Sequence, residues 1–315
     1  MRFALVGAVE GSLIALNALL AKGMLPSLVV TLPPEAADRH SDFADLTTPA
    51  RAAGSAVCHT TNVNAEDTLA AIRASAPDLV LVLGWSQICR EAFRAIPRLG
   101  VIGFHPSALP RLRGRGVIPW TILLDEKTTG SSLFWIDEGT DSGPIILQRL
   151  FSVAPDETAR SLYGKHVRNL AEMVPEAVEL AAAGKAPRVE QDHSLANYCA
   201  KRVAEDGLID WQRPAAEVLR LIRAVGEPYP GAFSRPDGKV VHIDAARPFA
   251  DSFRYIGLAA QVQTHTADGF TVMCGDRQCI EVTAWRTADG RRPPVHSKLG
   301  ASRGHCIGFS QAGPQ

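Results

Sequence analysis

Phe3-Ala4-Leu5-Val6-Gly7-Ala8-Val9-Glu10-Gly11 is an apolar run followed by a glycine-bounded turn. Four consecutive apolar residues are typical of a parallel strand that is buried on both faces. From Ser12 the leucines recur at helical spacing as far as Gly23, a common helix stop. Strand, glycine turn and helix in this order predict the first unit of a doubly wound α/β sheet. The full Gly-x-Gly-x-x-Gly pattern is absent, so the turn does not indicate a dinucleotide site.

Further apolar runs and helical patterns alternate along the next 160 or so residues, which favours a Rossmann-like sheet. Strands are expected at residues 28–32, 57–59, 79–83, 99–104, 130–136 and 144–148. Helices are expected at residues 48–54, 67–75, 91–96, 117–124 and 161–184. Pro175 lies inside the last of these and predicts a kink or a break there. The polar stretch 35–46 predicts a surface loop.

The composition changes near residue 193, and a polar connection follows. We therefore expect two domains, residues 1–203 and residues 204–315. The second domain has a helical pattern at 215–225 and short apolar segments at 240–245, 256–262, 270–274 and 280–285. Short strands at regular spacing predict a small β-barrel of the OB-like kind. The polar tail after Pro293 is expected to be loose.

Charge, hydropathy and cysteine content narrow the class of protein. Lys plus Arg and Asp plus Glu number 33 each in 315 residues, so no net charge indicates a polyanionic partner. No apolar run approaches the roughly 18–20 residues that cross a bilayer, so no membrane segment is expected. The six cysteines are scattered, and their spacing does not predict a zinc site. We expect a cytoplasmic protein with reduced thiols and no metal.

Residues 103–116 carry the most promising chemistry. His105 stands where a predicted strand gives way to a loop rich in proline, arginine and glycine. Imidazole moves protons near neutral pH, and catalytic side chains are frequent on such loops. A histidine that merely caps the strand is the alternative, and this stretch alone does not decide between them. Because ligands of open α/β sheets lie outside the carboxyl ends of strands, Gly84-Trp85-Ser86-Gln87 and His105 are expected to line one crevice.

A set of spaced motifs resembles the formyltransferases that use 10-formyltetrahydrofolate. The matching residues are His105, Ser107, Leu109-Pro110, Arg113-Gly114 and Asp141-Ser142-Gly143. Residues 202–211 and 222–233 resemble the hinge and C-terminal motifs of family members that act on UDP-4-amino-arabinose and on methionyl-tRNA. The resemblance therefore covers nearly the whole chain.

The resemblance implies that His105 and Asp141 are catalytic and lie beside the formyl group. The family carries an asparagine two residues before the histidine, thought to help hold the developing oxyanion, and this chain has Gly103 there. Protonated His105, a backbone N–H, a bound water, Ser86 or Gln87 is expected to replace it, with Ser107 in a supporting role.

The resemblance also implies a pterin pocket near the crevice and 10-formyltetrahydrofolate as co-substrate, without a metal. The residues at the matching places are Gly84, Trp85, Ser86, Arg115, Val117, Ile118, Asp137 and Gly139. Trp85 either packs against the cofactor or is a buried structural tryptophan.

The predicted acceptor is a small primary amine, most simply an amino sugar on a nucleotide, because residues 222–233 look most like the arabinose enzyme. Gly11 and Ser12, at a helix start, and Arg202 are the predicted acceptor-binding residues. Methionyl-tRNA is the first alternative, and tRNA binding needs a basic surface. The segment 33–54 instead sets four carboxylates, Glu35, Asp38, Asp42 and Asp45, against two arginines, Arg39 and Arg51.

A second alternative follows from Gly103: a protein that binds folate or hydrolyses the formyl donor without transferring it. The sequence determines neither the acceptor nor the oligomeric state.

Overall fold

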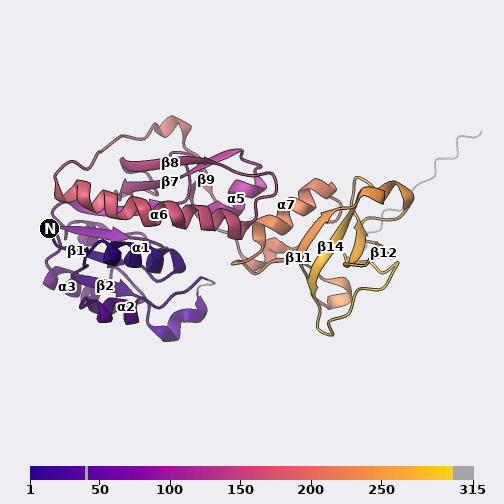
Figure 1. Ribbon diagram of the computed structural model, residues 1–315, viewed down its shortest axis with the longest axis horizontal. Coiled ribbons are helices and arrows are strands. Elements are labelled where there is room, and N and C mark those ends of the chain that lie inside the picture. Colours follow the sequence, from indigo (N-terminus) through magenta and orange to yellow (C-terminus); the bar gives the residue numbers. More distant parts are fainter. Residues whose placement is uncertain (40–41, 301–315) are drawn as a thin grey trace, which may run out of the picture. The chain divides into compact units, whose positions relative to one another are not determined.

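The computed structural model describes residues 1–39 and 42–300, which form two compact units (Figure 1). The first comprises Met1–Arg202 together with Glu227–Tyr229. The second comprises Val203–Gly226 and the described residues from Pro230 onward. The division between residues 202 and 203 lies beside the boundary expected after residue 203.

A seven-stranded mixed sheet forms the centre of the first unit. Its order is β3 (Ala56–His59), β2 (Leu28–Thr31), β1 (Phe3–Val6), β4 (Leu79–Val82), β5 (Gly100–His105), β7 (Thr128–Trp135) and β8 (Ile145–Ser152). The first five strands are parallel, whereas β7 runs antiparallel to β5 and β8 runs antiparallel to β7. Val82 pairs with Gly103, so β4 and β5 end at the same edge of the sheet. The predicted α/β class is confirmed.

Helices cover both faces of this sheet because successive residues of each buried strand point to opposite sides. Leu5 of β1 packs with α1 (Glu10–Ala21), α2 (Thr47–Ala52) and α6 (Ala159–Ala182). Ala4 and Val6 belong to a second core with α3 (Glu66–Ala74) and α4 (Glu91–Arg94). Helices α1 and α6 lie side by side on the first face (Figure 1).

Two local predictions in the first unit are corrected. Helix α6 stays helical from residue 159 to 182, so the break expected at Pro175 is absent. Its buried side, which includes Leu170, Met173 and Ala177, packs on the sheet core and compensates for the one backbone hydrogen bond that proline cannot donate. The loop expected at 35–46 contains a 3₁₀ helix, η1 (Pro34–Arg39).

The remaining elements of the first unit surround the loop that follows β5. They are β6 (Arg113–Gly114), α5 (Val117–Leu123), η2 (His193–Leu195) and β9 (Tyr198–Cys199). Strands β6 and β9 pair in parallel, which ties residues separated by about 85 positions along the chain. The segment near residue 198 therefore packs against the loop that carries Arg113.

The second unit is an antiparallel five-stranded sheet with one helix. Its order is β10 (Ala232–Ser234), β11 (Val241–Pro248), β14 (Cys279–Arg286), β13 (Phe270–Met273) and β12 (Val262–His265). The helix is α7 (Ala215–Val225), and the 3₁₀ helices are η3 (Ala204–Gly207), η4 (Pro236–Gly238) and η5 (Ala250–Arg254). Within the described residues β10 and β12 do not pair, so the predicted small barrel is open between them.

Two expectations for the second unit fail. The strand expected over 256–262 begins only at Val262, because Ala260 adopts a left-handed φ of 69° that interrupts an extended chain. The tail is held as far as Leu299, whose N–H donates to the Ala260 carbonyl. Residues 301–315 lie outside the described residues.

Gly7, at the first strand-to-helix turn, offers a test of this packing. A Cβ at Gly7 would lie 2.5 Å from the Leu83 carbonyl oxygen and 2.4 Å from Ser12 Oγ. We expect Gly7→Ala to lower the free energy of unfolding by about 2 kcal/mol or more, because backbone must move to relieve the overlap. Gly164→Ala is the matched control, since Gly164 lies in α6 with space for a methyl group. In urea unfolding, Gly164→Ala should raise the free energy of unfolding by about 0.5–1 kcal/mol. Equal changes in the two variants would contradict this interpretation.

Candidate functional site

His105 ends β5 and is buried, with 4% of its surface exposed. Its Nε2 lies 2.7 Å from the Leu112 carbonyl oxygen. A carbonyl can only accept, so Nε2 carries the hydrogen and Nδ1 is the nitrogen free to gain or lose a proton. Leu112 is held in a left-handed conformation with φ 56°, which turns its carbonyl toward the histidine loop.

Asp141 faces the free nitrogen of His105. Its Oδ2 lies 3.5 Å from His105 Nδ1 and accepts a 2.8 Å hydrogen bond from the Gly114 N–H. Asp141 itself adopts a left-handed φ of 51°, which aspartate tolerates better than most residues. A proton taken up on Nδ1 is therefore stabilised by a carboxylate at short range, and the pair is arranged for acid–base chemistry.

A second histidine lies behind this pair. His166 on α6 is 1% exposed; Ser131 Oγ lies 3.0 Å from its Nδ1, and its Nε2 has no hydrogen-bond partner. Burial, together with the nearby His105, lowers the pKa of His166 to about 3. His166 is therefore a neutral core residue on the buried face of α6.

Gly103 lies on β5 where the resemblance places an asparagine. A Cβ there would lie 2.9 Å from Ile136 Cγ1 and 3.0 Å from Phe134 Cζ. Two apolar side chains therefore occupy the space next to Gly103. A polar side chain at this position requires them to move.

Ser107 helps shape the loop that follows His105. It is fully buried; its hydroxyl donates to the Arg111 carbonyl at 2.7 Å, and its own carbonyl accepts from Ser132 Oγ at 2.7 Å. Ser107 thus ties the loop to itself and to β7. This supports its predicted role as a structural aid to His105.

The tetrapeptide after β4 lies at the same sheet edge as His105. Gly84 has φ 68°, and a Cβ there would lie 2.2 Å from Val9 Cγ2, so glycine is required. Trp85 is half-buried and packs against two clusters of buried apolar side chains, whereas Ser86 is exposed.

The side-chain amide of Gln87 is hydrogen-bonded to neighbouring loops, and this corrects its predicted role as an oxyanion donor. Its Nε2 donates to the Thr61 carbonyl, while its Oε1 accepts from Val63 N–H and from Trp85 Nε1. Both ends of the amide hold the neighbouring loops.

The other predicted cofactor residues lie on two segments. Val117 and Ile118 are buried in the first turn of α5, after the exposed Arg115, whose N–H donates to the Cys199 carbonyl. Asp137 accepts from the Gly139 N–H and from Ser142 Oγ, which closes the turn that leads to Asp141. The carboxylate of Asp137 thus shapes this loop.

The predicted acceptor residues at the start of α1 are corrected. Ser12 is fully buried; its hydroxyl donates to the Leu83 carbonyl at 2.6 Å and accepts from the Val9 N–H. The Gly11 N–H donates to Tyr163 Oη at 3.0 Å. Both groups are used within the fold and are not available to a phosphate or a sugar. Arg202 is half-buried and stacks on Trp120 of α5, 5.1 Å from the ring centre.

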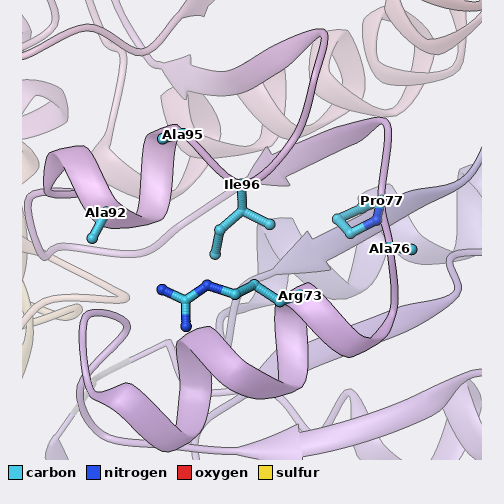
Figure 2. Close-up of a pocket in the computed structure, with 6 residues that line it drawn as sticks. All are labelled: Arg73, Ala76, Pro77, Ala92, Ala95 and Ile96. Carbon is cyan, nitrogen blue, oxygen red and sulfur yellow. The ribbon is translucent and has the colours of Figure 1, made fainter.

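A surface pocket elsewhere in the first unit is separate from these residues. It is lined by Arg73, Ala76, Pro77, Ala92, Ala95 and Ile96 (Figure 2). Ala76 and Pro77 precede β4, so this pocket lies at the amino end of that strand, opposite the edge where ligands of such sheets lie. Arg73 is paired with Glu66. We assign no function to this pocket.

Three polar residues organise the site, and the sequence pattern indicates only one of them, Arg113, which belongs to the family motif. Gln191 and Asn197 lie in a polar connection without periodicity. Asn197 Oδ1 accepts from the Leu112 N–H, and Gln191 contacts both Arg113 and the Asp141 loop. No local sequence signal indicates such contacts, because they join segments 50 or more positions apart.

Comparison with known proteins identifies the family. Residues 16–178 match the formyl transferase model, and residues 202–300 match the model of the formyl transferase C-terminal domain. The chain belongs to the formyl transferase family. The methionyl-tRNA formyltransferase of Anaeromyxobacter dehalogenans strain 2CP-C is 32% identical over 306 residues, which covers 96% of this chain and 97% of that protein. The enzyme of that name from Geobacter sulfurreducens is 36% identical over 181 residues, or 58% of this chain and 57% of that protein.

Solved structures share the formyltransferase fold. An N-formyltransferase from Helicobacter canadensis, in complex with folinic acid and dTDP-3-aminofucose, superposes with a TM-score of 0.65 at 18% identity and covers 90% of this chain and 99% of its own. HypX from Aquifex aeolicus, in complex with tetrahydrofolic acid, has a TM-score of 0.65 at 18% identity, over 91% of this chain and 44% of its own. Among residues 1–39 and 42–300 of this formyltransferase, no helix is long and apolar enough to cross a membrane.

The apolar side chains beside Gly103 lead to a prediction about stability. Gly103→Asn should lower the free energy of unfolding by about 1–3 kcal/mol, because Ile136 and Phe134 must move. The same change in an Ile136→Ala background should cost at least about 1 kcal/mol less, since the space is then open. Urea unfolding of the four proteins measures this coupling. Additive effects would contradict it.

His166 leads to a prediction about pH. Its folded-state pKa is about 3 and its ordinary value is 6.5, so the unfolded chain binds the extra proton first as the pH falls. The contribution of neutral His166 is fully present above pH 6.5 and is lost progressively toward pH 3, by at most about 1.4 kcal/mol per pH unit. His166→Gln should flatten the fall in unfolding free energy between pH 6 and pH 4. If the unfolding free energy of both proteins falls equally with pH, folded His166 binds its proton as readily as unfolded His166, and the prediction is wrong.

Proposed function

We propose that this formyltransferase moves a formyl group from 10-formyltetrahydrofolate to a primary amine. The observation that carries the proposal is the buried His105, with Nε2 fixed on the Leu112 carbonyl and Nδ1 facing Asp141 at 3.5 Å. An imidazole with one nitrogen fixed and the other opposite a carboxylate is suited to accept a proton and then return it.

The chemistry requires both proton movements. The amine nitrogen bonds to the formyl carbon, the bond from that carbon to N10 of the folate breaks, and negative charge builds temporarily on the formyl oxygen. One proton leaves the amine, and one is needed at N10. His105 Nδ1 is the residue atom placed for these transfers, and the Asp141 carboxylate stabilises the protonated ring.

We expect the pterin of the donor to bind beside His105. The required Gly84 brings the turn after β4 close to α1, and this turn ends at the same sheet edge as His105. Gly84, Trp85 and Ser86, the first turn of α5 and the loop containing Asp137 and Gly139 would hold the pterin. The co-substrate would supply the formyl group; the protein supplies the acid–base pair.

Methionyl-tRNA is the acceptor that the sequence relatives favour. The relatives reported above carry that name, and one of them matches over 97% of its own length. This supports the alternative acceptor over the nucleotide amino sugar predicted first, because the structures of sugar N-formyltransferases are only 18% identical to this chain.

A small amine, such as an amino sugar on a nucleotide, remains the second candidate because of the distribution of charge. In the second unit Arg247 pairs with Glu281 and Asp268, and Arg286 pairs with Asp244. Three further pairs are Arg213–Glu217, Arg235–Glu205 and Arg254–Asp251. Arginines neutralised in this way attract phosphates weakly.

The segment before α2, in the first unit, carries a stabilised negative charge. The Thr48 hydroxyl, together with the Thr47 backbone, lowers the pKa of Asp45, which is therefore ionised at neutral pH. A carboxylate held in this form repels a polyanion. This observation favours the small amine.

Release of tetrahydrofolate tests the proposal and separates the acceptors. The full chain is mixed with 10-formyltetrahydrofolate and methionyl-tRNA, with a nucleotide amino sugar, or with no amine. We expect amine-dependent release that falls by about 10²–10⁴-fold in His105→Asn and in Asp141→Asn. His265→Asn, in the second unit, is the matched control and should keep wild-type activity.

Each other outcome has a defined meaning. Release without any amine would favour hydrolysis, and folate binding without release would favour the binding-only alternative; either contradicts transfer. A KM for methionyl-tRNA that rises steeply between about 50 and 200 mM salt would favour tRNA as the acceptor. Turnover with the amino sugar alone would favour the small amine.

A further inference from the structure

Gln191 connects a distant segment to the loop that carries Asp141. Its side chain is 5% exposed, and its Nε2 donates to the Asp141 carbonyl at 3.0 Å and to the Gly143 carbonyl at 2.7 Å. The two acceptors lie on either side of Ser142, so one amide group spans the turn. A non-glycine residue in the left-handed region needs such support to stay there.

Arg113 determines which way this amide faces. Its Nη2 donates to Gln191 Oε1 at 2.7 Å, and because a guanidinium has no acceptor, the amide nitrogen must point toward the two carbonyls. Arg113 is 1% exposed; its Nη1 donates to Tyr198 Oη at 3.1 Å, and its Nη2 lies 3.0 Å from His193 Nδ1. Hydrogen bonds from a buried guanidinium are stronger than those between neutral groups.

The same distant segment also acts on the histidine side of the pair. Asn197 Oδ1 accepts from the Leu112 N–H, and the Leu112 carbonyl accepts from His105 Nε2. The Asn197 carbonyl accepts from the Arg113 N–H at 2.9 Å. Residues 191–197 therefore hold both loops whose side chains meet at His105 and Asp141.

We propose that Gln191 is a positioning residue for Asp141 in formyl transfer, oriented by Arg113. Its amide keeps the left-handed turn in the conformation that places the Asp141 carboxylate opposite His105 Nδ1. This role rests on the proposed function, because Asp141 must take part in the chemistry for its position to affect the rate.

Gln191→Glu is a sharp test because the side chain keeps its size. A carboxylate still accepts from Arg113, but it has no N–H to donate and would face two carbonyl oxygens. Gln191→Met keeps the length without either function and provides a second variant. Gln263→Glu is the matched control, since Gln263 is a buried glutamine of the second unit whose Nε2 donates to the Gln261 carbonyl.

Kinetics separate positioning from a general loss of stability. We expect Gln191→Glu and Gln191→Met to lower kcat by about 10- to 100-fold, with KM for the formyl donor changed by less than about 3-fold. In an Asp141→Asn background the same substitutions should cost almost nothing further, because Gln191 acts through that carboxylate. A full additional loss in that background, or wild-type kcat in both variants, would overturn the proposal.

Hydrogen exchange at Gly114 provides a readout that does not depend on turnover. The Gly114 N–H donates to Asp141 Oδ2, so a displaced Asp141 should speed its exchange by about 10-fold or more in Gln191→Glu. Gln263→Glu should leave that exchange unchanged. Faster exchange in a chain that never releases tetrahydrofolate would support the positioning of Asp141 and refute the proposed function. Unchanged exchange in both Gln191 variants would refute the positioning.

Discussion

The hydrogen bond between His105 Nε2 and the Leu112 carbonyl, 2.7 Å long and buried, is the constraint on which the site depends. It assigns the hydrogen of the neutral ring to Nε2 and leaves Nδ1 as the only nitrogen that can exchange a proton. The catalytic role proposed for Asp141 depends on its facing that nitrogen. If the ring turned over about its Cβ–Cγ bond, carbon atoms would take the places of both nitrogens and Asp141 would face no proton-exchanging atom.

Two loops in uncommon backbone conformations meet at this pair, and hydrogen bonds from a distant segment of the chain stabilise both. Leu112 and Asp141 have left-handed φ angles of 56° and 51°, which ordinary residues adopt at a cost of order 1–3 kcal/mol. Asn197 holds the first loop and Gln191 the second, each by side-chain hydrogen bonds. The strand pair β6–β9 keeps this distant segment in place.

The surroundings of the site distinguish this chain from what its motifs suggest. Ile136 and Phe134 fill the space beside Gly103, so charge on the formyl oxygen must be met by a group other than a side chain at that position. The paired arginines of the second unit limit the attraction of a long polyanion, although the sequence relatives carry the name of an enzyme that acts on tRNA.

The sequence by itself determined the order of strands and helices along the first unit, and it predicts His105 and Asp141 as the reacting pair. Short apolar runs such as residues 79–83 are typical of parallel strands that are buried on both faces, and the spacing of His105 and Asp141 matches the family motif. Only the tertiary structure decided that Ser12 is buried, that Gly103 is enclosed by apolar side chains, and that Gln191 supports Asp141. These facts depend on contacts between residues 31 to 71 positions apart, and no local pattern specifies which distant side chain will satisfy a given carbonyl or fill a given space.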